Sequence, residues 1–453
     1  MIKKDDILDI GITGMTHEGI GVGRIDGMVV FVQGALDGER ARIKIIKVTK
    51  TYAVARIEEL TEKSPLRQEP FCPVYKRCGG CSLQHMRYEK TLDFKHQVVI
   101  DNLQRIGGLT ELKVEPTLGM DKPSGYRNKA QYPVGMGKSG LEAGFFARRS
   151  HEIVNTKSCD IQHPVSDTAK AAVLEYMKAY KVSAYDEVTH YGLIRHVVTK
   201  VGIQTGEVMV IIVSASPSIP KRDKLVEILK GRVPGLQSVI LNINDQPGNV
   251  VLGKRNITLY GKDSIEDRLG GLIFEISPLS FYQINPVQTE ILYQKAITYA
   301  GLTGAETVFD LYCGIGTIAL FAAGKAKKVI GVEVIPEAVE AARRNAERNG
   351  ITNAEFYAGE AETVVPQLYE QGVKADVVFV DPPRKGCDEA LLRTLVAMAP
   401  RRIVYVSCNP STLARDLKYL TGEGFEVKEV QPVDMFPWTV HVESVVLITR
   451  VKD

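Results

Sequence analysis

Apolar and polar residues alternate along the first part of the chain in short, strand-like runs. Glycines separate most of these runs, which leaves little room for helices between them. The runs cover residues 7–12, 21–25, 28–32, 39–48 and 51–58. Short strands joined by glycine-rich turns are typical of a small antiparallel barrel, so we expect one over residues 1–62.

A different pattern marks the C-terminal part. A strand-like run at 307–311 leads into a glycine turn, and the run at 328–334 leads into a helical pattern over 336–348. Further β-branched runs lie at 377–380, 403–406 and 440–448. Strands that alternate with helices predict an open, Rossmann-like α/β sheet.

The middle of the chain mixes both patterns. Apolar residues recur at helical spacing over 90–106, directly ahead of Gly107 and Gly108. Strand-like pairs and two more helical patterns follow: 128–133 with 141–146, 194–203 with 207–214, and helices over 166–180 and 221–230. We therefore expect an α+β domain between the barrel and the α/β sheet.

Three short segments near the C-terminus follow or lie in strand-like runs. They are 381–384 (Asp-Pro-Pro-Arg), 407–410 (Ser-Cys-Asn-Pro) and 441–444 (His-Val-Glu-Ser). Loops at the carboxyl ends of strands converge on the ligand crevice of an open α/β sheet. We therefore expect the carboxylates of Asp381 and Glu443 and the thiol of Cys408 to share one pocket.

A thiol and a general base beside a methyl donor suit methylation of a pyrimidine carbon. C5 of uracil becomes nucleophilic when a thiolate adds to C6, and a base must later remove the C5 proton. Taken singly, Cys408 is more simply a core cysteine and Glu443 a surface glutamate, since free cysteine is often buried. Their pairing beside a cofactor turn favours catalysis.

The glycine turn at 310–317 predicts the cofactor. Gly314 and Gly316 allow close approach to the backbone, and Glu333, at the end of the next strand-like run, can accept hydrogen bonds from ribose hydroxyls. Ala319 replaces the third glycine of the dinucleotide pattern, and no phosphate-binding Lys-Ser/Thr pair follows. The turn thus favours S-adenosylmethionine over NAD or ATP.

Four of the seven cysteines form a separate group. Cys72, Cys78 and Cys81 lie within ten residues among glycines, and Cys159 stands alone downstream. We expect reduced thiols and hence a metal site with these four ligands. Spacing alone leaves both zinc and an iron–sulfur cluster open, because both accept four thiolates. Cys313 and Cys387 are expected to be packing residues.

Composition bounds the class of protein. The 453 residues are 44% hydrophobic and 25% charged, which fits roughly two to four globular domains. No apolar stretch reaches the ~18 residues of a membrane span, and residues 1–6 lack a signal-peptide core, so we expect a cytoplasmic protein. The net charge is only +3, so contacts with nucleic acid must come from local patches. Candidates are three cations on one strand face (Arg40, Arg42 and Lys44) and Arg127 and Lys129 among aromatics.

Five motifs occur together over the last 170 or so residues: 281–285 (Phe-Tyr-Gln-Ile-Asn), 310–317, 381–384, 407–410 and 441–443. In this order they resemble the RNA (uracil-5)-methyltransferase family. Residues 1–62 resemble a TRAM domain, the RNA-binding barrel of many family members. The resemblance implies that Cys408 is the nucleophile and Glu443 the acceptor of the C5 proton.

The resemblance also implies further ligands and contacts. S-adenosylmethionine would contact Gln283, Tyr312, Glu333, Asp381 and, on weaker grounds, Glu360. Cys72, Cys78, Cys81 and Cys159 would hold a [4Fe–4S] cluster, as several ribosomal members do. Phe281 would stack on a uridine splayed out of the RNA, and Arg127 and Lys129 would contact RNA.

The expected architecture has three parts. They are an OB-like TRAM barrel (1–62), an α+β central domain with the cysteine cluster (63–89 and 120–275), and a Rossmann-like S-adenosylmethionine-dependent methyltransferase domain (90–119 and 276–453). The cluster pattern and the barrel favour 23S ribosomal RNA, at uridines conventionally labelled 1939, 747 or both. We expect a monomer without membrane contact.

Four alternatives remain to be weighed. A transfer-RNA (uracil-5)-methyltransferase is the nearest, although tRNA members generally lack the cluster. A 5-methylcytosine enzyme needs a Pro-Cys dipeptide, which this chain lacks, and an amino-group methyltransferase needs an aromatic residue where Arg384 stands. A non-catalytic assembly factor would have lost Cys408 or Glu443, and both are present.

Overall fold

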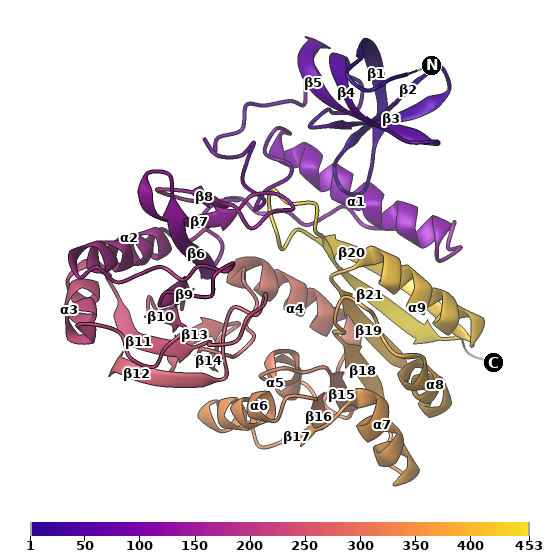
Figure 1. Cartoon of the computed structure of the whole chain (residues 1–453). Coiled ribbons are helices and arrows are strands. Elements are labelled where there is room, and N and C mark those ends of the chain that lie inside the picture. The colour runs from indigo at the N-terminus through magenta and orange to yellow at the C-terminus, as the bar shows by residue number, and fades with distance from the viewer. Residues whose placement is uncertain (1, 452–453) are drawn as a thin grey trace.

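The computed structural model describes residues 2–451, which form a small barrel and two larger sheets (Figure 1). None of the helices within these residues combines the length and the apolar character that crossing a membrane requires. The barrel lies at the N-terminal end, and the C-terminal sheet, shaded brown to yellow, lies farthest from it along the chain.

The N-terminal barrel is closed, with strand order β1-β2-β3-β5-β4. Its strands are β1 (Ile7–Met15), β2 (Gly21–Ile25), β3 (Met28–Gln33), β4 (Arg40–Val48) and β5 (Tyr52–Glu62). Val30 and Ile43 are fully buried in its centre. A side chain at Gly23 would begin 2.4 Å from the carbonyl oxygen of Gly11, so β1 and β2 need glycine there. The expected barrel is confirmed, except that β3 and β5 pair in parallel.

The central sheet has seven strands in the order β12-β11-β10-β9-β6-β7-β8. Its elements are β6 (Lys129–Gly137), β7 (Gly140–Phe146), β8 (Ile153–Asn155), α2 (Pro164–Ala179), β9 (Ile194–Val201), β10 (Val208–Ser214), α3 (Arg222–Arg232), β11 (Leu236–Ile243) and β12 (Arg255–Gly261). The sequence pattern did not predict β8, β11 and β12. Every residue of β9 and β10 is buried because α2 and α3 cover one face and the core of the C-terminal sheet packs on the other.

A hairpin and a helix connect the two sheets. These are β13 (Ile265–Leu269), β14 (Leu272–Ile276) and α4 (Pro286–Ala300). The C-terminal sheet then contains β15 (Thr307–Leu311), α5 (Thr317–Ala323), β16 (Lys328–Glu333), α6 (Pro336–Arg348), β17 (Ala354–Ala358), α7 (Ala361–Glu370), β18 (Val377–Val380), α8 (Glu389–Met398), β19 (Arg402–Ser407), α9 (Pro410–Gly422), β20 (Phe425–Val433) and β21 (Glu443–Arg450).

The strand order of this sheet is β17-β16-β15-β18-β19-β21-β20. The first five strands are parallel, and β21 runs antiparallel between β19 and β20. The order reverses beside β15, so a crevice opens at the carboxyl ends of β15, β16 and β18. The expected α/β fold is confirmed.

Helix α1 (Tyr88–Arg105) packs on α9 and β20, although more than 300 residues separate them along the chain (Figure 1). The segment after α1 runs beside β20 through bridges at Val114 and Leu118. The fully buried ammonium of Lys95 lies 2.5 Å from the carboxylate of Asp434. We retain as a proposal that residues 90–119 belong to the methyltransferase domain.

Candidate active site and cysteine pocket

The paired ends of two strands bring Cys408 and Glu443 together. Strands β19 and β21 pair antiparallel, and their ladder ends with Ser407 opposite Ser444. Cys408 directly follows β19, and Glu443 is the first residue of β21. The Glu443 carboxyl group lies close enough to raise the pKa of the Cys408 thiol, so the sheet brings a thiol and a carboxyl group to one edge.

The pocket around Cys408 disfavours negative charge. Burial, followed by the neighbouring carboxyl groups of Glu443 and Asp381, raises the pKa of the Cys408 thiol to about 11. Glu443 is 5% exposed, and burial raises its pKa well above the ordinary value. Burial also raises the pKa of Asp381 to about 7. Both carboxyl groups are thus stronger bases than an exposed glutamate.

Arg384 opposes this trend. Its guanidinium lowers the pKa of both Cys408 and Glu443, so it favours the thiolate and the carboxylate. The exposed side chain projects from the loop after β18, and its carbonyl oxygen accepts a hydrogen bond from Asn409 Nδ2 at 3.0 Å. The sequence analysis assigned Arg384 no role beside the thiol and used it mainly as an argument against an amino-group methyltransferase. Its position directly after Asp-Pro-Pro was the one sequence feature that indicated a place in this pocket.

The glycine turn after β15 is fastened to β16. Gly314 and Gly316 have φ angles of 54° and 83°, in the left-handed region that favours glycine. The Glu333 carboxylate accepts hydrogen bonds from the amides of Gly314 at 3.0 Å and Ile335 at 2.9 Å. A Cβ on Gly316 would approach Phe356 to 3.1 Å, so the turn is closely packed underneath.

Tyr312 and Asp310 flank this turn. Tyr312 has a φ of 66°, and its hydroxyl donates to Glu362 Oε1 at 2.7 Å, next to Glu360 at the start of α7. The Asp310 carboxyl accepts from the Ala319 amide through Oδ2, whereas buried Oδ1 has no partner among the described residues. Burial raises the pKa of Asp310 well above its usual range.

Gln283, in the loop before α4, contacts a tyrosine of that helix beside the pocket. Its side chain interacts with the hydroxyl of Tyr293, which also lies 3.1 Å from Thr317 Oγ1 at the start of α5. The Asp381 carboxyl lies close enough to raise the pKa of Tyr293. The residues expected to bind the cofactor thus come from the ends of β15, β16, β17 and β18 and the loop before α4.

Comparisons with known proteins agree with this geometry. The sequence model of the tRNA (uracil-5-)-methyltransferase family matches residues 254–451, and that of the TRAM domain matches residues 6–57. A protein of Caldanaerobacter subterraneus subsp. tengcongensis, described as an uncharacterized RNA methyltransferase, is 54% identical over 450 residues, 99% of either chain. The chain belongs to the tRNA (uracil-5-)-methyltransferase family.

Other members match over the same length. A Halalkalibacterium halodurans protein of the same description is 49% identical over 447 residues, covering 99% of this chain and 98% of that one. Among solved structures, the Pyrococcus abyssi tRNA (uracil-54, C5)-methyltransferase in complex with S-adenosyl-L-homocysteine is 30% identical. The match covers 97% of this chain and 99% of the Pyrococcus abyssi chain, with a TM-score of 0.78. The protein is thus an S-adenosylmethionine-dependent RNA methyltransferase of the uracil-5 family.

In this methyltransferase, the residues predicted to contact RNA occupy two places. Phe281 is 65% exposed in the loop before α4, and Asn128 fastens that loop by donating to the carbonyl oxygen of Gln283 at 2.9 Å. Lys129 lies opposite Lys200 of β9, near the same loop. Arg127 instead lies in the wall of the cysteine pocket. The RNA contacts remain predictions.

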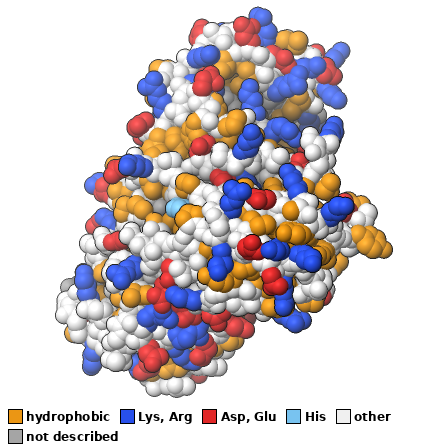
Figure 2. Space-filling model, turned by 90° about the vertical axis from the view of Figure 1, so that its left-hand side faces the viewer, with side chains coloured by type: hydrophobic (Ala, Val, Ile, Leu, Met, Phe, Trp, Pro, Cys, Tyr) orange, Lys and Arg blue, Asp and Glu red, His pale blue; other side chains and the backbone are white. Residues whose placement is uncertain are grey.

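Three cations on β4 are already paired with carboxylates. Arg40, Arg42 and Lys44 share one face as expected, but Arg42 lies 3.3 Å from Asp9 and 3.8 Å from Glu59. Lys44 lies 3.1 Å from Asp5, and Arg40 lies 3.9 Å from Glu62. Acidic and basic side chains accordingly mix over the barrel at the top of Figure 2. This face offers less free positive charge than the sequence predicts.

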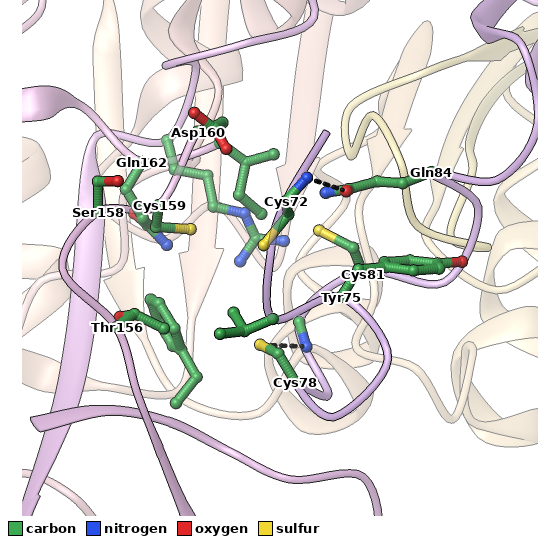
Figure 3. Close-up of a pocket in the computed structure, with 15 residues that line it drawn as sticks. Cys72, Tyr75, Cys78, Cys81, Gln84, Thr156, Ser158, Cys159, Asp160 and Gln162 are labelled. Atoms are coloured by element: carbon green, nitrogen blue, oxygen red, sulfur yellow. Dashed lines mark hydrogen bonds between the residues drawn. The ribbon is translucent and has the colours of Figure 1, made fainter. Parts of the chain in front are cut away.

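The four predicted cysteine ligands line one cavity of about 60 Å³ (Figure 3). Cys72, Cys78 and Cys81 project from the loop before α1, and Cys159 projects from the opposite wall. Backbone amides fix this arrangement: Gly80 N donates to Cys78 Sγ at 3.4 Å, and Cys72 N donates to Gln84 Oε1 at 3.2 Å. The structure thus gathers residues more than 75 positions apart around one space.

The structure does not show the metal site that the sequence predicts here. Within residues 2–451, no three His, Cys, Asp or Glu side chains approach as ligands of one metal ion. Thiolates on one zinc would lie about 3.8 Å apart, from a Zn–S distance of ~2.3 Å. The cavity is also several times larger than the ~10–15 Å³ that holds a water molecule. It suits a group of several atoms.

Arg127 adds a positive charge to this pocket. Its guanidinium lowers the pKa of Cys81, which burial raises to about 12. Burial similarly raises the pKa of Cys159 to about 11. Among the described residues, the only hydrogen bond that the Arg127 guanidinium donates is a long one, 3.4 Å, to the Tyr126 hydroxyl. A half-buried cation with unused donors favours an anionic occupant, such as a group held by thiolates.

Proposed function

We propose that this protein methylates C5 of a uridine in 23S ribosomal RNA through a covalent adduct between Cys408 and C6. One observation carries the proposal. The Cys408 thiol, just after β19, lies beside the buried carboxyl group of Glu443 at the start of β21, at the edge of the sheet that also carries the glycine turn. A nucleophile, a base and a cofactor site in one crevice are what the reaction needs.

The residues around the glycine turn fit S-adenosylmethionine. Glu333 and Glu360 stand at the ends of β16 and β17, where ribose and adenine contacts are expected, and Gln283, Tyr312 and Asp381 complete the wall. Asp310 Oδ1, an acceptor without a partner among residues 2–451, could receive a donor from the ligand. Bound there, the cofactor supplies an electrophilic methyl group.

Cys408 begins the reaction. Its thiolate attacks C6 of the uracil ring, and the resulting enolate makes C5 nucleophilic. The high thiol pKa opposes this step, so the Arg384 guanidinium, which lowers that pKa, must favour the thiolate. Arg384 therefore acts electrostatically on the nucleophile.

Glu443 ends the reaction. After the methyl group joins C5, one oxygen of Glu443 takes the C5 proton. The electrons of that C–H bond form the C5–C6 double bond, and the bond between C6 and Cys408 breaks. Burial raises the pKa of Glu443, which makes its carboxylate a stronger base for a weakly acidic carbon. The thiolate is regenerated for another turnover.

We also propose that Cys72, Cys78, Cys81 and Cys159 hold a [4Fe–4S] cluster. Support comes from the four thiols that line one cavity, from the size of that cavity and from the positive charge of Arg127. The cluster would order the loop before α1 and help position RNA, because methyl transfer is redox-neutral and requires no electron.

RNA recognition would use the surface near Phe281. The exposed ring can stack on the splayed uridine, Lys129 lies near the loop that presents it, and Arg127 would contact RNA from the wall of the cysteine pocket. The TRAM barrel would contribute through Lys47 and Lys50, exposed cations without an ion pair among the described residues. We expect the protein to act as a monomer in the cytoplasm.

Transfer RNA is a second candidate substrate. The Pyrococcus abyssi enzyme named for uracil 54 of tRNA matches nearly the whole chain, so the barrel does not by itself favour ribosomal RNA. Mass-spectrometric mapping of 5-methyluridine in cells with and without the protein tests both. Loss of a methyl group from 23S RNA is expected. Loss from tRNA alone would reassign the substrate, and loss from neither would contradict the proposal.

A further inference from the structure

The segment 434–442 links β20 to β21, which begins at Glu443. Its backbone carbonyls are held from several distant parts of the chain. Asn285 donates to Met435 O at 3.0 Å, Lys95 to Phe436 O at 3.1 Å and the Tyr126 hydroxyl to Pro437 O at 3.0 Å. The amides of Ser82 and Leu83 donate to Trp438 O at 2.8 and 3.0 Å. The segment therefore connects the cysteine loop to β21.

Trp438 is the centre of this segment. Its indole N–H donates to Pro123 O at 2.6 Å. The centroid of its ring lies 5.1 Å from that of the Phe71 ring and 5.2 Å from that of the Tyr88 ring. It packs with Cys81 in one buried cluster and is 6% exposed. Its φ of 67° is unfavourable for a bulky residue, so the conformation depends on these surrounding contacts.

Glu443, by contrast, has little support of its own. No group within residues 2–451 hydrogen bonds to its carboxyl oxygens, so their position follows from the backbone where β21 begins. Only four residues lie between Trp438 and Glu443. A shift of the strained segment would therefore displace the carboxyl group directly.

We propose that Trp438 is a positioning residue for Glu443 that couples the cysteine pocket to proton removal from C5. The contact runs from Cys81 through the next two amides to the carbonyl oxygen of Trp438. The inference rests on the proposed role of Glu443 as base. A loosened cysteine loop would release Trp438, its backbone would relax, and the start of β21 would move.

Only the last chemical step should respond. Cys408 and Asp381 follow β19 and β18, and the parallel ladder of the sheet fixes both strands independently of 434–442. The glycine turn belongs to β15 and β16. Disturbing Trp438 should therefore leave adduct formation and methyl transfer largely intact and slow release of the methylated RNA.

Single-turnover assays of the full chain with the Trp438→Ala and Trp438→Phe variants test this coupling. Total methylated RNA and released methylated RNA are measured separately after denaturation. We expect methyl transfer within about threefold of wild type, but release at least about tenfold slower, with a protein–RNA adduct on a denaturing gel. Trp438→Phe retains the ring and should show a smaller defect. S-adenosylmethionine affinity checks that each variant is folded.

A spectroscopic measurement tests the link from the other side. Trp438 is the only tryptophan of the chain, so intrinsic fluorescence reports its surroundings. Cys81→Ser should shift the emission to longer wavelengths and produce the same slow release. Unchanged emission together with normal release in Cys81→Ser would contradict the coupling.

The Glu443→Gln variant separates this inference from the proposed function. Adduct in Glu443→Gln but normal release in both Trp438 variants would overturn only the positioning role. No adduct in Glu443→Gln would overturn the assignment of the base itself. Equal slowing of methyl transfer and release in Trp438→Phe would also overturn the inference, because the defect would then be general.

Discussion

The two thiol-lined pockets of this protein are built in opposite ways. The proposed catalytic pocket lies where strands of a sheet end, and the pairing of β19 with β21 brings Cys408 and Glu443 to the same edge. The cysteine pocket lies among loops, since residues 63–87 contain no helix and no strand beyond isolated bridges. Backbone ladders hold the first pocket, whereas we propose that a bound cluster completes the second.

The cysteine loop nevertheless has two anchors. Near its start, the Arg67 guanidinium binds both oxygens of buried Glu39, at 2.5 and 2.7 Å, and thereby joins the loop to the barrel. Near its end, the Trp438 carbonyl accepts its two hydrogen bonds. The part between these anchors carries the three clustered cysteines. We therefore expect mutations in the two pockets to affect different properties.

The largest effect should come from removing the nucleophile. Cys408→Ala should lower methylation by about 10⁴-fold or more, since no adduct can form. Melting temperature, S-adenosylmethionine affinity and RNA affinity should remain near wild type, because the sheet does not depend on this half-buried side chain. Transfer of a radiolabelled methyl group measures the loss of methylation, and calorimetry measures the melting temperature and the two affinities. Turnover above a few per cent of wild type would exclude Cys408 as the nucleophile.

Glu443→Gln should lower turnover by roughly 10²–10⁴-fold, the range of a lost general base. Adduct formation and methyl transfer precede proton removal, so the enzyme should stall joined to methylated RNA. A denaturing gel should show this slow-migrating species, which Cys408→Ala cannot form. Normal turnover would mean that another group removes the proton.

The sequence predicted the catalytic pocket better than its surroundings. Strand ends converge in any open α/β sheet, so local motifs sufficed to bring Asp381, Cys408 and Glu443 together. Arg127 could not be placed, because its position depends on how the loops around Cys159 fold. The ion pairs of Arg42 depend on its register with β1 and β5, which no local pattern encodes.

Mutations in the cysteine pocket should lower the melting temperature and the RNA affinity more than the affinity for S-adenosylmethionine. Cys81→Ser should lower the melting temperature by about 5–10 °C and RNA affinity by about tenfold, because it removes one ligand of a centre that joins segments some 80 residues apart. S-adenosylmethionine affinity should change little, since its site lies on the sheet. Thermal melting and binding titrations measure all three quantities. Cys387→Ser is a matched control, as it alters a buried thiol outside the pocket.

The identity of the bound group can be checked directly. Anaerobically purified protein should be brown, with a broad charge-transfer band and about four irons per chain. Colourless protein with one zinc per chain would exclude the cluster but retain the thiolate site. Protein without either metal would contradict the proposed role of all four cysteines.

The smallest effect should come from Arg384, the cation of the catalytic pocket. Its guanidinium lowers the pKa of Cys408, which is about 11 with the arginine present. Arg384→Gln should therefore raise that pKa, reduce the thiolate fraction at neutral pH and slow methylation about 3–10-fold at saturating RNA. Arg384→Lys keeps a positive charge and should change the rate less. The pH dependence of Cys408 alkylation, with Cys408→Ala as the blank, measures the thiol pKa. An unchanged pKa with weaker RNA binding would mean that Arg384 contacts RNA instead, and the catalytic thiol would then depend on the substrate for its activation.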